Sequence, residues 1–380
     1  GGTSTAISVT NCPVNAILMR YGNAQQKRDW LTPLARGEML GAFCLTEPHV
    51  GSDASALRTT AVKQGDEYVI NGVKQFITSG KNGHVAIVIA VTDKGAGKKG
   101  MSAFLVPTNN PGYVVARLED KLGQHSSDTA QINFDNCRIP AENLIGAEGE
   151  GYKIALSALE GGRIGIAAQS LGMARSAFEV AVDYAKQRES FGTAIFNHQA
   201  VGFRLADCAT QLEAARQLIW HAAALRDAGR PCLKEAAMAK LFASEVAESV
   251  CSAAIQTLGG YGYVSDFPVE RIYRDHLTLE LAKADQAPTS KDSFTTYFLA
   301  AKYWINQGTQ LDQAAAYLDK AGRIDKNFWY YEWRARLLQK QGKVQEALPL
   351  LTQAKALAAG KAPQAYIDGL DVLKGQWTKK

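Results

Sequence analysis

The chain has 380 residues, a net charge of +5 and 46% hydrophobic residues, which is typical of a soluble globular protein with two or three domains. No apolar run reaches the roughly 18 residues of a membrane-spanning helix, so no span is predicted. Residues 288–380 hold 14 Lys and Arg against 8 Asp and Glu. These charges are spread along helical patterns rather than clustered, which argues against nucleic-acid binding.

Residues 1–41 are predicted to be helical. Apolar residues recur at helical spacing over residues 6–20, and residues 23–34 form a second, shorter amphipathic segment. The first residue is Gly1 rather than Met, and neither an intact start nor a signal peptide is visible. We expect this region to be the remnant of a truncated helical domain.

Residues 42–148 are predicted to form a β domain. Short runs rich in Val, Ile, Phe and Thr are separated by Gly, Asn and Asp, with no helix of useful length between them. The predicted strands are residues 68–70, 73–78, 85–91, 102–106, 112–117 and 130–134. We expect them to form an antiparallel sandwich or barrel.

Residues 149–287 are predicted to form a helical bundle. Glycines such as Gly192 and Gly259 separate long, Ala-rich amphipathic stretches. The predicted helices are residues 152–185, 198–227 and 233–258. An all-helical domain thus follows an all-strand domain, so the fold class is α+β and multidomain.

The last part of the chain, residues 288–380, differs in composition, since it holds four of the six Trp and no Cys, His or Met. The run AKYWINQG at residues 301–308 is similar to ARLLQKQG at residues 335–342, an offset of 34 residues. This looks like a pair of tetratricopeptide-type helical hairpins. Two such repeats rarely suffice alone, so residues 362–376 are expected to form a capping helix.

Cysteine and histidine usage gives no sign of a metal site or a disulfide framework. The six cysteines and six histidines are scattered, without the close pairs that bind zinc. An enzyme-sized chain without an export signal normally keeps its thiols reduced. We therefore predict a cytoplasmic protein with no metal.

Two motifs in the β domain carry a family resemblance. The run FCLTEPHVGSD occupies residues 43–53, and KQFIT occupies residues 74–78. Together they resemble the acyl-CoA dehydrogenases, in which the first motif forms a loop beside the flavin and the second a strand along its ring. The resemblance implies FAD as the cofactor. Its flavin-side contacts would be Phe43, Leu45, Thr46, Ser52, Phe76, Ile77 and Thr78.

The chemistry of a flavin suits these residues. A flavin that receives hydride needs hydrogen-bond donors at its pyrimidine edge, where negative charge develops on reduction. By the resemblance, Thr46 and Thr78 would supply such donors, and Ser52 would also touch the CoA portion of the substrate. Phe76 stands where Trp is common in the family.

Motifs in the helical domain extend the resemblance. EGGRIGIAA at residues 160–168 is similar to the substrate-contacting start of the family's first bundle helix. The substrate contacts that it implies are Glu160, Gly162 and Arg163. RESFG at residues 188–192 and NHQ at residues 197–199 resemble the segments that reach the FAD phosphates and adenosine, where a forked Arg suits a pyrophosphate.

QTLGGYGY at residues 256–263 resembles the segment that a neighbouring subunit lends to the adenosine end of FAD, which implies a homo-oligomer. With this segment, the implied contacts at the phosphate and adenosine end are Arg188, Phe191, Gln199, Gln256, Leu258, Gly259 and Gly260.

The expected catalytic carboxylate is missing. Register with the family puts Lys283 where the base that removes the α-proton usually stands, and Gly162 where a minority of the family carries it. A Lys with an unperturbed pKa near 10.4 cannot accept a proton at neutral pH. Glu280, three residues before Lys283, and Glu160, near the substrate segment, are the candidates for a relocated base. By the resemblance, we also expect the amino-terminal helices that wall the acyl pocket in the family to be missing.

Two functions remain open on the sequence. The resemblance implies α,β-desaturation of an acyl-CoA thioester in fatty acid metabolism, with an electron-transfer flavoprotein reoxidising FAD. Without the usual base, this chain is expected to have little or no such activity. The alternative is a composite, non-catalytic scaffold whose helical repeat segment binds a peptide partner.

Overall fold

The computed structural model describes residues 2–286, 294, 297–298, 301–302, 304–306, 308 and 311–378. Side chains are described for the same residues except 2 and 279–286. The chain forms two compact units, Gly1–Thr278 and Leu279–Lys380. Among the described residues, no helix is both long and apolar enough to cross a lipid bilayer.

The first unit begins with short helical segments. They are α1 (Gly2–Val9), η1 (Thr10–Asn15), α2 (Ala16–Tyr21), α3 (Ala24–Gln26), η2 (Lys27–Leu31) and α4 (Thr32–Ala35). The predicted helices are confirmed, but the first is interrupted at Cys12, whose backbone is non-helical (φ −148°, ψ 112°). A residue before proline is disfavoured in the helical region, so Pro13 explains the break. Asn23 opens the second stretch with a capping box to Gln26.

One mixed sheet of eight strands follows. The strands are β1 (Gly41–Cys44), β2 (Thr60–Gln64), β3 (Glu67–Thr78), β4 (Val85–Val91), β5 (Met101–Pro107), β6 (Tyr113–Leu118), β7 (Thr129–Pro140) and β8 (Leu144–Ile145). Their order is β6-β7-β3-β2-β4-β5-β8, with β1 beside β4. All six predicted strands are confirmed, the first two being joined in β3.

The expectation of a purely antiparallel sheet is wrong. β4 pairs in parallel with β1 along four residues and with β2 at Thr60 and Val91. The chain crosses over between these strands instead of returning through a tight hairpin, and a residue pattern does not encode strand direction. The mixed sheet is the arrangement that brings the ends of β1 and β3 close together.

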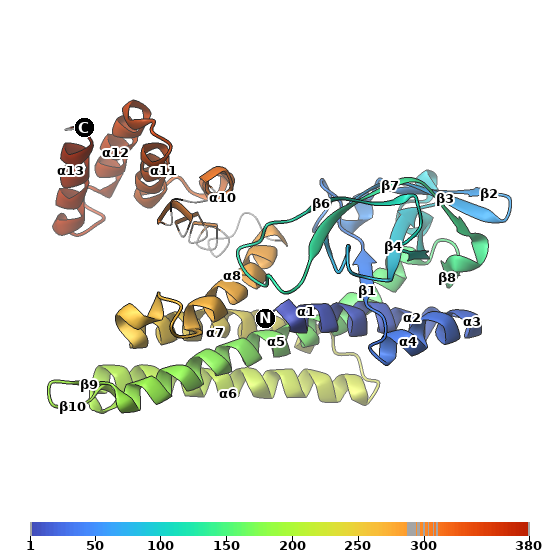
Figure 1. Ribbon diagram of the computed structural model, residues 1–380, viewed down its shortest axis with the longest axis horizontal. Helices are drawn as coiled ribbons and strands as arrows, with labels where there is room; N and C mark the ends of the chain where they lie inside the picture. Colours follow the sequence, from blue (N-terminus) through green and yellow to red (C-terminus); the bar gives the residue numbers. More distant parts are fainter. Residues whose placement is uncertain are drawn as a thin grey trace. The chain divides into compact units, whose positions relative to one another are not determined.

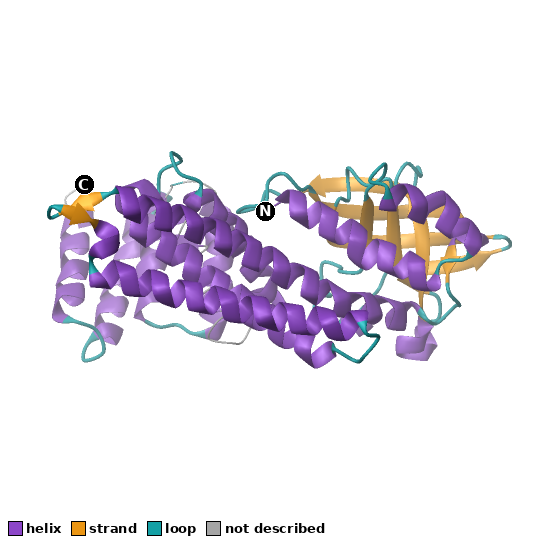
Figure 2. Cartoon of the chain, turned by 90° about the horizontal axis from the view of Figure 1, so that it is seen from below, coloured by secondary structure: helices purple, strands orange, loops and turns teal. Residues whose placement is uncertain are grey.

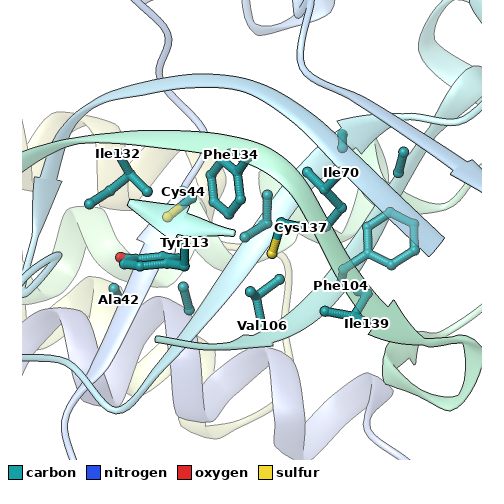
Figure 3. Packing of buried hydrophobic residues seen from close by; sticks show 14 of the residues in the cluster. Ala42, Cys44, Ile70, Phe104, Val106, Tyr113, Ile132, Phe134, Cys137 and Ile139 are labelled. Atoms are coloured by element: carbon teal, nitrogen blue, oxygen red, sulfur yellow. The ribbon is translucent and has the colours of Figure 1, made fainter. Parts of the chain in front are cut away.

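The sheet is packed on both faces, which is clearest along β4. Ala86, Val88 and Ala90 face an interior shared with side chains from β1, β3, β5, β6 and β7, as Figure 3 shows for Cys44, Ile70, Phe104, Tyr113 and Phe134. The alternating residues Val85, Ile87 and Ile89 face the other way and pack against helical residues such as Ile17 and Ile154. Figure 2 shows helices lying across that face.

Three long helices form the second half of the unit. They are α5 (Gly151–Gln187), α6 (Gln199–Asp227) and α7 (Leu233–Leu258), followed by α8 (Val269–Gln286). The three predicted helices are confirmed. They run side by side in Figure 1, packed through small residues such as Ala174, Ala215 and Ala247. The short strands β9 (Glu189–Ser190) and β10 (Thr193–Ala194) connect α5 to α6 at the bundle end far from the sheet.

The described part of the second unit is helical. Its long helices are α10 (Leu311–Ile324), α11 (Phe328–Lys340), α12 (Val344–Ala358) and α13 (Gln364–Thr378). The helix predicted at residues 362–376 is confirmed as α13, and its role as a cap of helical repeats stays a prediction. Ala335, Ala347 and Ala354 form a buried contact where α11 and α12 approach closely. Tyr303 and Gln307 of the first predicted repeat lie outside the described residues, and the tetratricopeptide assignment stays a prediction.

Candidate functional site

The loop after β1 is fixed against β3 by backbone hydrogen bonds. Glu47 and Val50 each donate an N–H to the other's carbonyl at 3.0 Å, which closes a tight turn around Pro48. The N–H of Gln75 donates to the carbonyl of Thr46 at 2.9 Å. Thr46 is therefore held beside the end of β3 where the second motif lies.

A bulge in β3 pushes Phe76 out of the sheet. The register with β7 shifts between Lys74 and Ile77, and Phe76 has a φ of +59°. Positive φ is uncommon for a bulky residue and marks a constrained turn of the backbone. The ring of Phe76 is 58% exposed, whereas Ile77 is 2% exposed and packs in the sheet interior. The bulge thus presents a flat aromatic surface beside Thr46 and Thr78.

A buried ion pair joins the same two segments. The ammonium of Lys74 in β3 lies 2.9 Å from the Glu47 carboxylate, and both side chains are almost completely buried, at 0% and 1% exposed. Burial by itself raises the pKa of the Glu47 carboxyl, but Lys74 and hydrogen bonds from Arg58 and Thr59 outweigh it and leave the pKa below its usual value. Glu47 is therefore ionised at neutral pH.

Gln124 forms a polar junction between four segments of the unit. Its side-chain oxygen accepts hydrogen bonds from Thr5 of α1 and from Gln169 of α5 at 3.3 Å. Its amide nitrogen donates to the Asp275 carbonyl of α8 at 3.1 Å, and its backbone N–H donates to the Asp275 carboxylate. The segment that precedes the expected catalytic position is thereby tied to the β domain.

Residues of the substrate motif face different sides of α5. Ala158, whose carbonyl accepts a hydrogen bond from Cys12, shares a face with Gly162 and Gln169 by helical spacing. A Cβ at Gly162 would have no heavy atom within 4 Å, so this face has room for a side chain. Glu160 lies on the opposite side, where the Cys232 thiol donates to its carboxylate at 3.3 Å.

Gly161 and Arg163 are the neighbours of Gly162 in α5. Gly161 is buried against α6, because a Cβ there would lie only 2.0 Å from the Arg226 guanidinium. Arg163 is half-buried on the next position of the helix after Gly162. The two consecutive glycines thus differ in role: the first allows close helix packing and the second leaves open space.

The residues predicted for the phosphate and adenosine end of FAD lie together at the far end of the bundle. Arg188 follows α5, Gln199 begins α6, and Gln256 lies in the last turn of α7. Rings of Tyr184, Tyr261 and Phe267 pack 5.6–6.2 Å apart and join these helix ends.

This far end presents exposed groups suited to a phosphate-containing ligand. Phe191 is 99% exposed, and a Cβ at Gly259 or Gly260 would meet nothing within 4 Å. Leu258 differs from its neighbours, since it is 2% exposed and packs inside the bundle. Gln256 also lines an open groove of about 610 Å³ between α6 and α7.

The two groups of predicted FAD contacts are far apart along one chain. Gln169, which contacts the β-domain loop through Gln124, precedes Arg188 on α5 by a stretch of roughly 28 Å at 1.5 Å rise per residue. Thr46 and Phe76 belong to the β domain, whereas Arg188 and Gln256 lie beyond that stretch, at the bundle end drawn far from the sheet in Figure 1.

The chemical types of the residues at these two places match the two ends of FAD. Threonine hydroxyls and an exposed ring at the β domain match a flat heterocycle, and Arg188 with two unobstructed glycines matches a pyrophosphate and its close approach. Of the other predicted contacts, Phe43 and Leu45 are half-buried against the helix-covered face of the sheet, and Ser52 is exposed.

The structure describes the candidate catalytic bases less completely than the candidate FAD contacts. The side chains of Glu280 and Lys283 lie outside the described residues, so the role of Glu280 stays a prediction. Glu160 contacts Cys232 on the bundle side of α5, and its catalytic role also stays a prediction. Sequence reasoning assigned no function to Lys74 or Gln124. A charged Lys in an apolar strand was the available signal for the first, and no pattern pointed to the second.

Two family descriptions match the chain. The one described as "Acyl-CoA dehydrogenase, middle domain" matches residues 42–137, and the one described as "Acyl-CoA dehydrogenase, C-terminal domain" matches residues 149–283. Both lie within the first compact unit or end close to its boundary.

Individual acyl-CoA dehydrogenases are also similar to this chain in sequence and in structure. An acyl-CoA dehydrogenase of Bacillus subtilis (strain 168) is 51% identical over 266 residues, which is 70% of each chain. The structure of butyryl-CoA dehydrogenase from Megasphaera elsdenii aligns with a TM-score of 0.70 and 42% identity, over 75% of this chain and 77% of that one. A chain from a structure described as the electron transferring flavoprotein of Acidaminococcus fermentans aligns with a TM-score of 0.71 and 47% identity, over 75% and 73%.

Proposed function

The chain belongs to the acyl-CoA dehydrogenase family, and from that membership we propose that its first unit binds FAD and an acyl-CoA thioester, as enzymes that desaturate the α,β bond do. Members of the family are FAD-dependent flavoproteins that dehydrogenate acyl-CoA. The observation that carries the proposal is the edge formed by Thr46 and by the bulge with Phe76, held together by the 2.9 Å bond from Gln75 to Thr46.

At that edge the chain's own residues would orient the cofactor. Phe76 provides a face for the ring, and the hydroxyls of Thr46 and Thr78 donate to its pyrimidine edge, where charge develops. Bound FAD supplies the acceptor for the hydride that leaves the β-carbon. Arg163, beside Gly162 on α5, binds the thioester side of the substrate.

We propose further that this chain lacks an efficient base for the α-proton. Gly162 offers only a hydrogen where the alternative base of the family would stand, and Lys283 occupies the usual position. The consequence is a protein that binds FAD and acyl-CoA but turns over slowly. The test is steady-state turnover of butyryl-CoA with an artificial electron acceptor; a rate typical of the Bacillus subtilis relative would contradict the proposal.

The separation along α5 supports a shared cofactor site. Arg188 and Gln256 lie at the far end of the bundle and can meet the FAD that Thr46 holds only if they come from another copy of the chain. Two large apolar residues of α6, Phe203 and Trp220, are exposed at 65% and 60%, which leaves apolar surface that a second copy could cover. We propose a homo-oligomer. A monomer carrying one FAD per chain in analytical ultracentrifugation would contradict it.

Electrons must leave reduced FAD for each new cycle. One structurally similar chain comes from a structure described as an electron transferring flavoprotein. We propose an electron-transfer flavoprotein as the physiological acceptor of this chain.

All six cysteines, each in the described part, are free thiols, and burial raises the pKa of Cys44 and of Cys251 to about 12. Such unreactive thiols suit the cytoplasmic location that we also propose.

A second candidate function rests on the second unit. Its successive helices α10 to α13 are joined by short turns, and Gly308 and Gly342, 34 residues apart, both have positive φ, at +69° and +77°. This recurrence supports a tetratricopeptide-like segment from about residue 288, which would bind a peptide partner. Flavin that never bleaches with any short acyl-CoA, together with peptide capture by the full chain, would favour this scaffold function over the enzyme.

A further inference from the structure

The ion pair between Glu47 and Lys74 lies between the two segments that face the flavin. Glu47 belongs to the loop that follows β1, one residue after Thr46. Lys74 belongs to β3, directly before the bulge that exposes Phe76. The pair therefore bridges two parts of the chain that are distant in sequence and adjacent at the candidate site.

Both charged groups have specific partners. The Lys74 ammonium donates to the Glu47 carboxylate at 2.9 Å and to the Leu45 carbonyl at 3.0 Å. The Glu47 carboxylate also accepts backbone N–H groups of Arg58 at 2.8 Å and Thr59 at 3.0 Å. Hydrogen bonds to charged groups are short and directional. The pair thus fixes the loop at both of its ends, near Leu45 and near Thr59.

We propose that the Glu47–Lys74 ion pair is a positioning device that holds Thr46 at a set distance from Phe76 and Thr78 before FAD binds. The inference rests on the proposed function of this edge in flavin binding. A site whose donors are already in place loses less conformational freedom on binding, and its affinity rises accordingly. Neither Glu47 nor Lys74 contacts the cofactor in this account; each acts through the segments that it holds.

A positioning role can be separated from a purely structural one by replacing both charges together. Removing one partner leaves a buried charge without compensation, but replacing both by apolar residues of similar volume is often neutral for stability. The double variant E47L/K74M therefore keeps the packing while it removes the contacts to Leu45, Arg58 and Thr59. The matched control is the exposed pair of Glu67 in β3 and Arg138 in β7, 3.2 Å apart, replaced as E67Q/R138Q.

The experiment titrates the full-length apoprotein of each variant with FAD and records affinity, the visible flavin spectrum and the melting temperature. We expect E47L/K74M to fold with a lowered melting temperature, because the Leu45 carbonyl and the N–H groups of Arg58 and Thr59 lose their partners. We expect it to bind FAD about tenfold more weakly and to show a shifted flavin band, since tenfold corresponds to a modest loss of binding free energy. The control should match the wild type in all three. Wild-type affinity and spectrum in a folded E47L/K74M would overturn the inference and leave the proposed function intact.

Hydrogen exchange on the wild type tests the same idea without any substitution. If the loop is held before FAD binds, the backbone amides of Arg58, Thr59 and Gln75 are protected in the apoprotein as strongly as in the FAD complex. Fast exchange of these amides in the apoprotein would overturn the inference even if E47L/K74M did not fold. A wild type that binds no FAD at all would instead overturn the proposed function, and the inference with it.

Discussion

The edge of the β domain that we propose to face flavin and the side of α5 that we propose to face substrate differ in how many of the expected residues they hold. At the edge, Thr46 and the bulge at Phe76 are connected through backbone hydrogen bonds and the buried Glu47–Lys74 pair. On α5, Gly162 faces open space where the family resemblance allows a base. Cofactor binding and proton abstraction depend on separate residues, so a fold can keep the first while it lacks the second.

The largest expected effect comes from adding the missing carboxylate. A Cβ at Gly162 would meet no heavy atom within 4 Å, so Gly162→Glu introduces a carboxylate without a clash at its first carbon, and a positioned base typically contributes on the order of 10²–10⁴-fold to a rate. We expect butyryl-CoA turnover to rise within that range while FAD affinity stays unchanged. Stopped-flow and steady-state assays measure the first, and FAD titration the second.

Glu160→Gln is the matched control for that variant, since Glu160 lies on the other side of α5 and contacts Cys232. It should leave the rate of Gly162→Glu unaltered. If Glu160→Gln abolished wild-type turnover, Glu160 would be the base and the contrast between the two regions would disappear.

A large stability effect is expected on the flavin side. Lys74→Met leaves the Glu47 carboxylate buried without its cation, and breaking a buried ion pair in this way typically costs about 3–5 kcal/mol. Urea unfolding should show that loss for Lys74→Met and a much smaller one for E47L/K74M. Equal losses in the two proteins would mean that the charges do not act as a pair.

A smaller loss is expected at the junction that ties α8 to the β domain. Gln124→Leu keeps most of the volume but removes the side-chain bonds to Thr5, Gln169 and Asp275, and unsatisfied buried groups cost about 1–3 kcal/mol. Chemical unfolding measures the change. Gln25→Leu, at an exposed position, should change the free energy of unfolding very little. An equal loss in both variants would mean that the buried hydrogen bonds of Gln124 make no special contribution to stability.

The smallest expected effect is a loss of stability at low pH. The pKa of Glu47 is lowered in the fold, so its contribution to stability is complete above the unfolded value of about 4.5 and is lost as pH falls through the lower folded value. The wild type should therefore lose stability more steeply below pH 4.5 than E47L/K74M, which cannot titrate there. Parallel unfolding curves across that range would show that Glu47 is not stabilised as a carboxylate.

The sequence predicted the elements well where the pattern was local. The apolar run of β4 and the Ala-rich helix α5 were found within a few residues, because periodicity and glycine breaks depend on neighbouring residues. It failed where the structure depends on distant segments. The parallel pairing of β1 with β4 could not be read from the composition of either strand.

The candidate site shows the same limit. The motif residues Thr46 and Phe76 were named from sequence, but the ion pair that connects their segments joins positions 27 apart and leaves no periodic signal. Gln124 has a φ of +56° and contacts residues from three other segments, which no local pattern encodes. Resemblance supplied the residues that we propose to touch ligands, and only the structure showed the contacts that connect their segments.

Inefficient removal of the α-proton can be tested by adding butyryl-CoA anaerobically to the FAD-loaded wild-type protein and following the visible absorption of the bound flavin. We expect FAD to stay bound and its absorption to persist, because the residues proposed to bind it are present and the α-proton has no efficient base. Rapid bleaching of the flavin would contradict it and would show that another carboxylate of this chain, Glu280 or Glu160, removes the proton.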